Sequence, residues 1–181
     1  AANLTATGAI SQTGALTVGG ATTINAPSQA VTLANANNDF VGAVTLTSAG
    51  SVTLADKNSL TVSGSAASLT ATAVGAVSDT GGTIAGNATL TSTSDAAVSS
   101  AATVGGTLST NGGATTVSGT VGALATDSST LSLGTTTVTG AANLTATGAI
   151  SQTGALTVCG ATSINAPGQT VTLANANNDF V

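Results

Sequence analysis

Residues 1–41 read AANLTATGAISQTGALTVGGATTINAPSQAVTLANANNDFV, and residues 141–181 repeat this stretch with four substitutions. The offset between the two copies is 140 residues, with no insertion or deletion. The substitutions replace Gly19 by Cys159, Thr23 by Ser163, Ser28 by Gly168 and Ala30 by Thr170. A duplication in constant register is the sequence signature of a repeat architecture, in which neighbouring units stack on one another.

Pairs of apolar residues separated by one Thr or Ser run along the whole chain. They occur at Leu16/Val18, Val31/Leu33, Val44/Leu46, Val52/Leu54, Leu60/Val62, Leu131/Leu133, Leu156/Val158 and Val171/Leu173. This alternation is typical of a half-buried strand, with the intervening Thr or Ser facing outward. No window shows the spacing of an amphipathic helix, so we expect no helix.

Turn signals separate the apolar pairs. They lie at residues 19–20, 26–28, 37–39, 55–58, 78–82 and 111–113, and all contain Gly, Asn, Asp or Pro. These residues favour turns because they adopt positive φ or fix a corner. In the turn around Asn38 we expect side-chain amides to satisfy backbone groups, with Phe40 filling the core beside it.

Strand centres recur every six to nine residues or so, a spacing that hairpins or a solenoid could both produce. Very short strands, an unchanging pattern and the in-register duplication favour the solenoid. We therefore predict an all-β chain: a right-handed parallel β-helix with three short strands and about 20 residues per coil. Residues 1–181 would form one continuous solenoid segment of a longer repeat array. The 140-residue unit would make ~7 coils, and the whole chain ~9 coils over ~43 Å.

The composition is far from that of an ordinary globular domain. Only 4% of the residues are charged, against roughly 25% in typical domains, and the net charge is −5. The only aromatic residues are Phe40 and Phe180, which occupy the same repeat position. Such side chains can fill only a narrow core. No run of about 20 apolar residues occurs, so we expect no membrane insertion.

Several function classes lack the residues they need. The chain has no His or Arg, and its only basic side chain is Lys57. Polysaccharide-cleaving β-helices combine clustered acids with basic side chains, so we expect neither enzymatic activity nor a cofactor. An acidic chain without aromatic platforms is not expected to bind nucleic acid.

The acidic residues also give little sign of a metal site. They are Asp39, Asp56, Asp79, Asp95, Asp127 and Asp179, and no two are close in sequence. The nearest approach to a calcium-binding GGxGxD repeat, at residues 79–83, does not match it. We expect no metal, with each Asp capping a turn. The adjacent Asp56 and Lys57 are expected to form a solvated turn that contributes little.

Two surface features leave a choice open. Thr-x-Thr pairs at Thr5/Thr7, Thr45/Thr47, Thr70/Thr72, Thr89/Thr91, Thr91/Thr93, Thr137/Thr139 and Thr145/Thr147 resemble an ice-binding design, but do not recur at a constant spacing. Outward Thr on strands is the simpler interpretation. Cys159 has no partner for an internal disulfide. An unpaired surface thiol is the default interpretation of Cys159, and a lateral cross-link between fibres is the alternative.

Three stretches carry a family resemblance: LTATGAI at residues 4–10, GALTVGG at residues 14–20 and NDFVG at residues 38–42. With these stretches the whole chain resembles the repetitive shaft of filamentous-haemagglutinin-like adhesins and related giant bacterial surface proteins. The resemblance implies a right-handed parallel β-helix, secreted by a type V route, that forms a stalk or fibre on a bacterial surface. The shafts of this family offer no catalytic residues to carry over.

We therefore expect a structural protein: a rigid extended spacer in the shaft of a secreted bacterial adhesin or surface fibre, located outside the cell or on its surface. Its partners would be further copies of itself, through axial stacking or lateral bundling, or host and other-cell receptors bound through parts outside this segment. Two alternatives stay open. One is a self-assembling extracellular filament or sheath subunit that stacks end to end; the other is an ice-binding or carbohydrate-binding solenoid.

Overall fold

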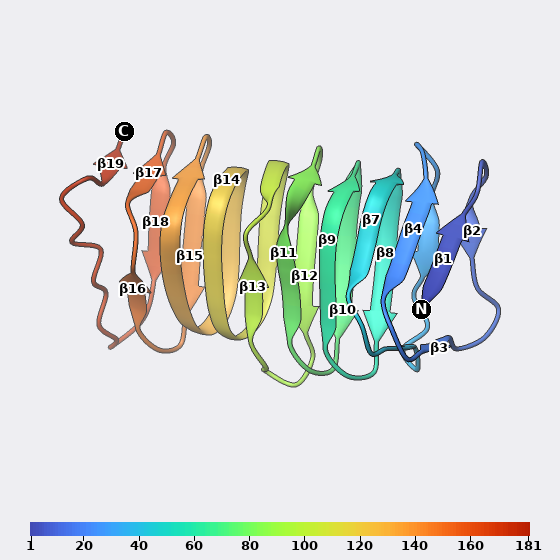
Figure 1. Ribbon diagram of the computed structural model, residues 1–181. Coiled ribbons are helices and arrows are strands. Elements are labelled where there is room, and N and C mark those ends of the chain that lie inside the picture. Colours follow the sequence, from blue (N-terminus) through green and yellow to red (C-terminus); the bar gives the residue numbers. More distant parts are fainter.

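A computed structural model describes all of residues 1–181 and shows an all-β protein. The chain winds as a parallel β-solenoid of about nine turns, with ~20 residues per turn. Figure 1 shows these turns side by side in a rod, with the N-terminus near the blue end and the C-terminus at the red end. The predicted parallel β-helix is therefore confirmed, and no helix interrupts it.

Every strand pairing is parallel, and the strands form one 17-stranded sheet plus the two-stranded pair β3–β6. No antiparallel hairpin occurs. The strands are β1 (Ala2–Thr5), β2 (Ile10–Ser11), β3 (Thr17–Val18), β4 (Thr22–Ala26), β5 (Val31–Leu33), β6 (Asp39–Phe40), β7 (Val44–Ala49), β8 (Ser51–Asp56), β9 (Leu60–Ala66), β10 (Ser68–Ala73), β11 (Val77–Ile84), β12 (Ala88–Ser92), β13 (Val98–Ser100), β14 (Thr103–Val138), β15 (Ala142–Ala146), β16 (Ile150–Gln152), β17 (Leu156–Val158), β18 (Thr162–Asn165) and β19 (Asp179–Phe180).

Side chains of the same kind stack along the axis of the rod. The three strands of the first coil, β1, β2 and β3, pair with β4, β5 and β6 of the second. Between β5 and β8, Val31 lies on Val52 and Leu33 on Leu54, while the intervening Thr residues also stack. The buried apolar residues form one cluster of 36, composed of Ala, Val, Leu and Ile with Phe40 as the only aromatic. The core is therefore narrow and continuous along the rod, as expected for a chain that lacks the large side chains of a wide core.

Strand β14 departs from the prediction of three short strands per coil. It runs without a break for 36 residues and winds around the axis as a continuous ribbon (Figure 1). The predicted turn at 111–113 lies inside β14, and the predicted turn at 78–82 lies inside β11, so both predictions are wrong. Because glycine lets an extended backbone bend sharply, the chain turns these corners while it stays in the sheet.

The two copies of the repeated stretch lie on different sides of the solenoid. Successive registers from β2 upward align Ile10, Val31, Val52, Leu69, Ala88 and Leu108. Within β14, the hydrogen bond from Asn111 to Asp127 shows that residues 16 apart lie on successive coils, so Leu108 aligns with Leu124. Leu124 in turn pairs with Ala142. Ala142 thus lies seven coils from Ile10, but it is eight residues before Ile150, the counterpart of Ile10. The 140-residue unit therefore spans seven coils and a little over one third of a turn, rather than seven alone.

The asparagine-rich turn behaves as the sequence predicts. Asn38 is fully buried and receives a hydrogen bond from the Leu16 N–H at 2.9 Å, while its amide nitrogen donates to the Leu33 carbonyl at 3.0 Å. Its side chain also bonds to that of Gln12, a partner that the sequence did not reveal. Phe40 is buried beside this turn. The turn therefore links two coils through side chains where the backbone ladder is interrupted.

Some buried threonine hydroxyls have no hydrogen-bond partner. The Oγ1 atom of Thr115 is buried and unpaired, whereas that of Thr136 lies 3.1 Å from the Val117 carbonyl and 3.0 Å from that of Gly134. Burying an unpaired hydroxyl costs free energy, and a paired one contributes roughly 1 kcal/mol. Val has nearly the same shape as Thr without the hydroxyl.

We expect Thr115→Val to raise the free energy of unfolding by about 1 kcal/mol, and Thr136→Val to lower it by a similar amount. Urea unfolding followed by circular dichroism measures both changes. Thr136→Val is the matched control, since it makes the same substitution at another buried position of the same strand, β14. Equal effects of the two substitutions would contradict the assignment of partners.

Candidate functional site

The chemically distinctive side chains are spread along the rod. No group of three or more His, Cys, Asp or Glu residues is close enough to hold a metal ion. Five of the six acidic residues occupy three settings: an exposed groove with Asp95 and Asp127, a turn with Asp39 and Asp56, and an isolated buried Asp79. The sixth, Asp179, is exposed on β19.

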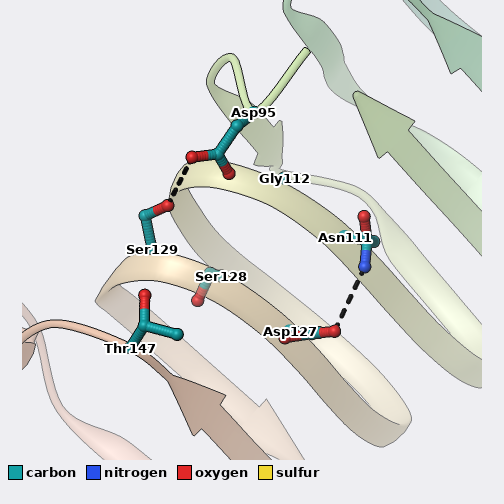
Figure 2. A pocket seen from close by; sticks show the side chains of 7 residues that line it. All are labelled: Asp95, Asn111, Gly112, Asp127, Ser128, Ser129 and Thr147. Carbon is teal, nitrogen blue, oxygen red and sulfur yellow. Dashed lines mark hydrogen bonds between the residues drawn. The ribbon is translucent and has the colours of Figure 1, made fainter. Parts of the chain in front are cut away.

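The most polar hollow is a groove lined by residues of four successive coils (Figure 2). Asp95 lies in the turn between β12 and β13, at a φ of 59°, and Asn111, Asp127 and Ser129 lie on β14. Ser129 Oγ donates to Asp95 Oδ2 at 2.8 Å, and Asn111 Nδ2 donates to Asp127 Oδ2 at 3.2 Å. The groove has a volume of about 310 Å³, and no hydrophobic residue lines it.

This groove can accept and donate hydrogen bonds, but its residues do not form a catalytic arrangement. Both carboxylates are already held by a neutral neighbour, and the other lining groups are hydroxyls and backbone. The sequence did not reveal the groove as a unit. A signal was present, because Asp95, Asn111 and Asp127 are each 16 residues apart, close to one coil. This spacing predicts a groove only if the length of the coils in that part of the chain is already known.

The expectation that Asp56 and Lys57 form a solvated pair is wrong. Asp56 is 3% exposed and accepts hydrogen bonds from the backbone N–H groups of Phe40 at 2.7 Å and Asn58 at 2.6 Å. Lys57 instead pairs with Asp39 of the coil below, with Nζ 3.0 Å from Oδ2. Asn58 also donates to Asp39, at 3.1 Å. Because side chains alternate along a strand, adjacent residues point to opposite sides, and the pairing is between coils rather than along the chain.

Asp79 is a buried carboxyl group on the inner side of β11. It is 3% exposed, its Oδ1 accepts a hydrogen bond from the Gly81 N–H at 3.2 Å, and its Oδ2 is unpaired. Burial raises the pKa of Asp79, and the Gly81 N–H and the nearby Ser100 hydroxyl oppose this only in part. The folded state therefore favours the protonated acid more than the unfolded chain does.

Stability is expected to fall with rising pH because of this group. The folded pKa of Asp79 lies above the unfolded value of 3.8, so its contribution is fully present below pH 3.8 and is lost as the pH rises through the folded pKa. We expect Asp79→Asn to unfold at higher urea concentration than the parent at pH 7, with the difference shrinking toward pH 3. Asp127→Asn, at an exposed position, controls for the change of net charge. A gain for Asp79→Asn that is independent of pH would contradict this account.

The two surface features predicted from the sequence both face outward. Cys159 is an exposed free thiol in the bend that follows β17, so the structure leaves the cross-link as a prediction. None of the Thr-x-Thr pairs is buried. Thr70 and Thr72 stack on Thr89 and Thr91 between β10 and β12, but this two-coil array does not extend along the face as a regular lattice. Outward Thr on strands therefore describes these pairs.

No helix in the structure is long and apolar enough to cross a membrane. No curated protein and no solved structure matches the chain. The model of one family, described as repeats of unknown function (DUF5649), matches residues 1–47, 49–99 and 121–181. These matches cover most of the chain and include both copies of the 41-residue stretch. The chain belongs to this family of repeats, DUF5649.

Proposed function

We propose that the chain is a rigid spacer in the shaft of a secreted bacterial adhesin or surface fibre, and that its task is to hold other parts of the protein at a fixed distance. It would act outside the cell or on its surface, without catalysis and without a cofactor. Receptor binding would belong to parts outside this segment. The proposal extends the plainer conclusion that a β-solenoid of repeats suggests a structural protein.

The observation that carries the proposal is the unbroken ladder along the rod. Parallel pairings connect every coil to the next, from β1 and β4 at one end to β15 and β18 at the other. A single core runs through the same coils. Each coil is therefore held by backbone hydrogen bonds and by packing to both neighbours, which resists bending far better than a flexible linker does.

The outer surface also fits a spacer. It carries Thr, Ser and Asn, a net charge of −5 and one ion pair, between Lys57 and Asp39. Such a surface offers no basic patch for nucleic acid. The family resemblance of residues 4–10, 14–20 and 38–42 to adhesin shafts adds the bacterial surface as the expected location.

Rigidity can be tested with a single pair of probes. Cys159 is the only cysteine and is exposed, so a donor dye on its thiol and an acceptor on the N-terminus report the length of the rod. We expect one narrow distance of about 35–40 Å, since roughly eight coil spacings of ~4.8 Å separate the labels. A broad distribution of distances in native buffer would overturn the spacer role, because a flexible chain cannot set a fixed separation.

A second candidate, a subunit that stacks end to end into filaments, is favoured by one observation. Phe180 and Val181 are exposed at the C-terminal end, where apolar surface invites association. Sedimentation velocity separates the two candidates. Rods that remain monomeric at high concentration would remove the filament, whereas species that lengthen with concentration would support it.

A further inference from the structure

The C-terminal face of the rod exposes apolar side chains that are buried in the other copy of the repeat. Ile164, Val171 and Phe180 are 42%, 40% and 46% exposed. Their counterparts Ile24, Val31 and Phe40 are 0%, 0% and 2% exposed. The same sequence is thus seen twice in one molecule, once with the next coil in place and once without it.

Residues 42–66 include the coil that covers this surface in the first copy: β7 and β8 lie on it, and β9 already stacks on β7. Ile24 pairs with Leu46, and Val31 pairs with Val52. The cover also has specific polar contacts: Asp56 accepts the Phe40 N–H at 2.7 Å. In addition, the Lys57 ammonium lies 3.0 Å from the Asp39 carboxylate. In the second copy the equivalent carboxylate, Asp179, has no ion pair.

We infer that the face formed by residues 162–181 is a binding surface for a β-solenoid coil with the sequence of residues 42–66, supplied by a further copy of the 140-residue unit. The substitutions between the two copies do not touch the buried contacts. Ser163, Gly168 and Thr170 all lie at outward or turn positions, and Gly168 keeps the positive φ, 69°, that Ser28 has at 59°. The surface is therefore the same one that residues 42–66 already cover.

The N-terminal face of the rod would be covered by a different segment of the repeat unit. Leu4 and Ile10 are only partly buried and border an opening of about 360 Å³, whereas their counterparts Leu144 and Ile150 are buried. Those counterparts are covered by β14, in which Leu131 pairs with Ile150. The exposed end of the first coil would therefore be covered by a coil with the sequence of residues 122–138. Direct stacking of two 181-residue chains would instead place residues 2–18 on residues 162–180, an arrangement seen nowhere in the molecule.

This mode of growth determines how an array displays its surface. Each added unit advances by seven coils and a little over one third of a turn, as the alignment from Ile10 to Ala142 shows. Equivalent outward positions, such as Gly19 and Cys159, therefore face different directions in successive units. A feature that occurs once per unit would wind around the rod rather than form a stripe along one side.

Hydrogen exchange followed by mass spectrometry tests the inference on the whole chain. One chain carries residues 42–66 appended after Val181, and a control carries residues 1–25, which have the same length and a similar composition. We expect amides of residues 162–181 to exchange at least about tenfold more slowly with the first extension. The N–H groups that point along the axis, away from the rod, would then gain carbonyl partners in the added coil. The control extension should leave them unchanged.

Two further chains make the result decisive. An extension by residues 42–99 guards against fraying of a single added coil, and an extension that carries the Asp56→Ala change tests the polar contacts. Protection should persist or increase with the longer extension and weaken markedly with Asp56→Ala. Equal protection by the 1–25 extension, or none by either of the extensions that begin at residue 42, would overturn the inference.

Discussion

Replacing Gly64 with alanine is expected to lower the free energy of unfolding by at least about 3 kcal/mol. Gly64 has a φ of 105°, which side chains of L-residues rarely adopt. A Cβ atom there would lie 2.0 Å from the Leu46 carbonyl oxygen, in the strand directly below. Since that oxygen belongs to the backbone of the ladder, the clash can be relieved only by separating β7 from β9.

Gly8→Ala is the matched control for this prediction. Nothing lies within 4 Å of a Cβ atom added at Gly8, and its φ is not in the left-handed region. We expect a change of no more than about 0.5 kcal/mol there. Urea unfolding of the two variants under the same conditions gives the comparison. A loss at Gly64 similar to that at Gly8 would show that the close approach of these coils is wrong.

A second position repeats the geometry of Gly64 and shows why the backbone comes so close. Gly82 has a φ of 125°, stacks on Gly64, and an added Cβ would lie 2.0 Å from the Gly64 carbonyl oxygen. The register between β9 and β11 shifts between Asp79 and Gly82. The two glycines therefore allow the chain to bend on the same side of consecutive coils, at the point where the predicted turn at 78–82 proved to be part of a strand.

The periodic pattern was enough to predict the architecture, because it depends on the alternation of small apolar and hydroxyl side chains. Val31, Leu33, Val52 and Leu54 could be assigned to the core from spacing alone, and the structure stacks them as expected. Coil length could be predicted only as an average. Paired residues of different strands on successive coils are 17 to 23 residues apart in the sequence, as from Ser51 to Ser68 and from Asn25 to Ser48.

The polar contacts were harder to predict, because they depend on the local length of each coil. Asp95, Asn111 and Asp127 meet only because two successive coils are short in that part of the chain. Lys57 faces Asp39 rather than Asp56 for a related reason: its partner is set by the coil below. Such contacts follow from register, and composition carries no information about register.

Phe40→Ala is expected to lower the free energy of unfolding by about 3–5 kcal/mol, whereas Phe180→Ala in the same chain should cost less than about 1 kcal/mol. Phe40 is 2% exposed and fills a core of otherwise small aliphatic residues, so its removal leaves a cavity. Phe180 has the same neighbours on one side only and is 46% exposed. Urea or thermal unfolding of both variants measures the difference.

The same pair of substitutions links stability to the binding face of the last coil. When residues 42–66 follow Val181, Phe180 should become as buried as Phe40, and Phe180→Ala should then cost nearly as much as Phe40→Ala. The control is the extension by residues 1–25, in which Phe180→Ala should remain nearly neutral. If Phe180→Ala costs the same with and without the 42–66 coil, that coil does not cover the face, and the repeat unit does not grow in the register that its first copy displays.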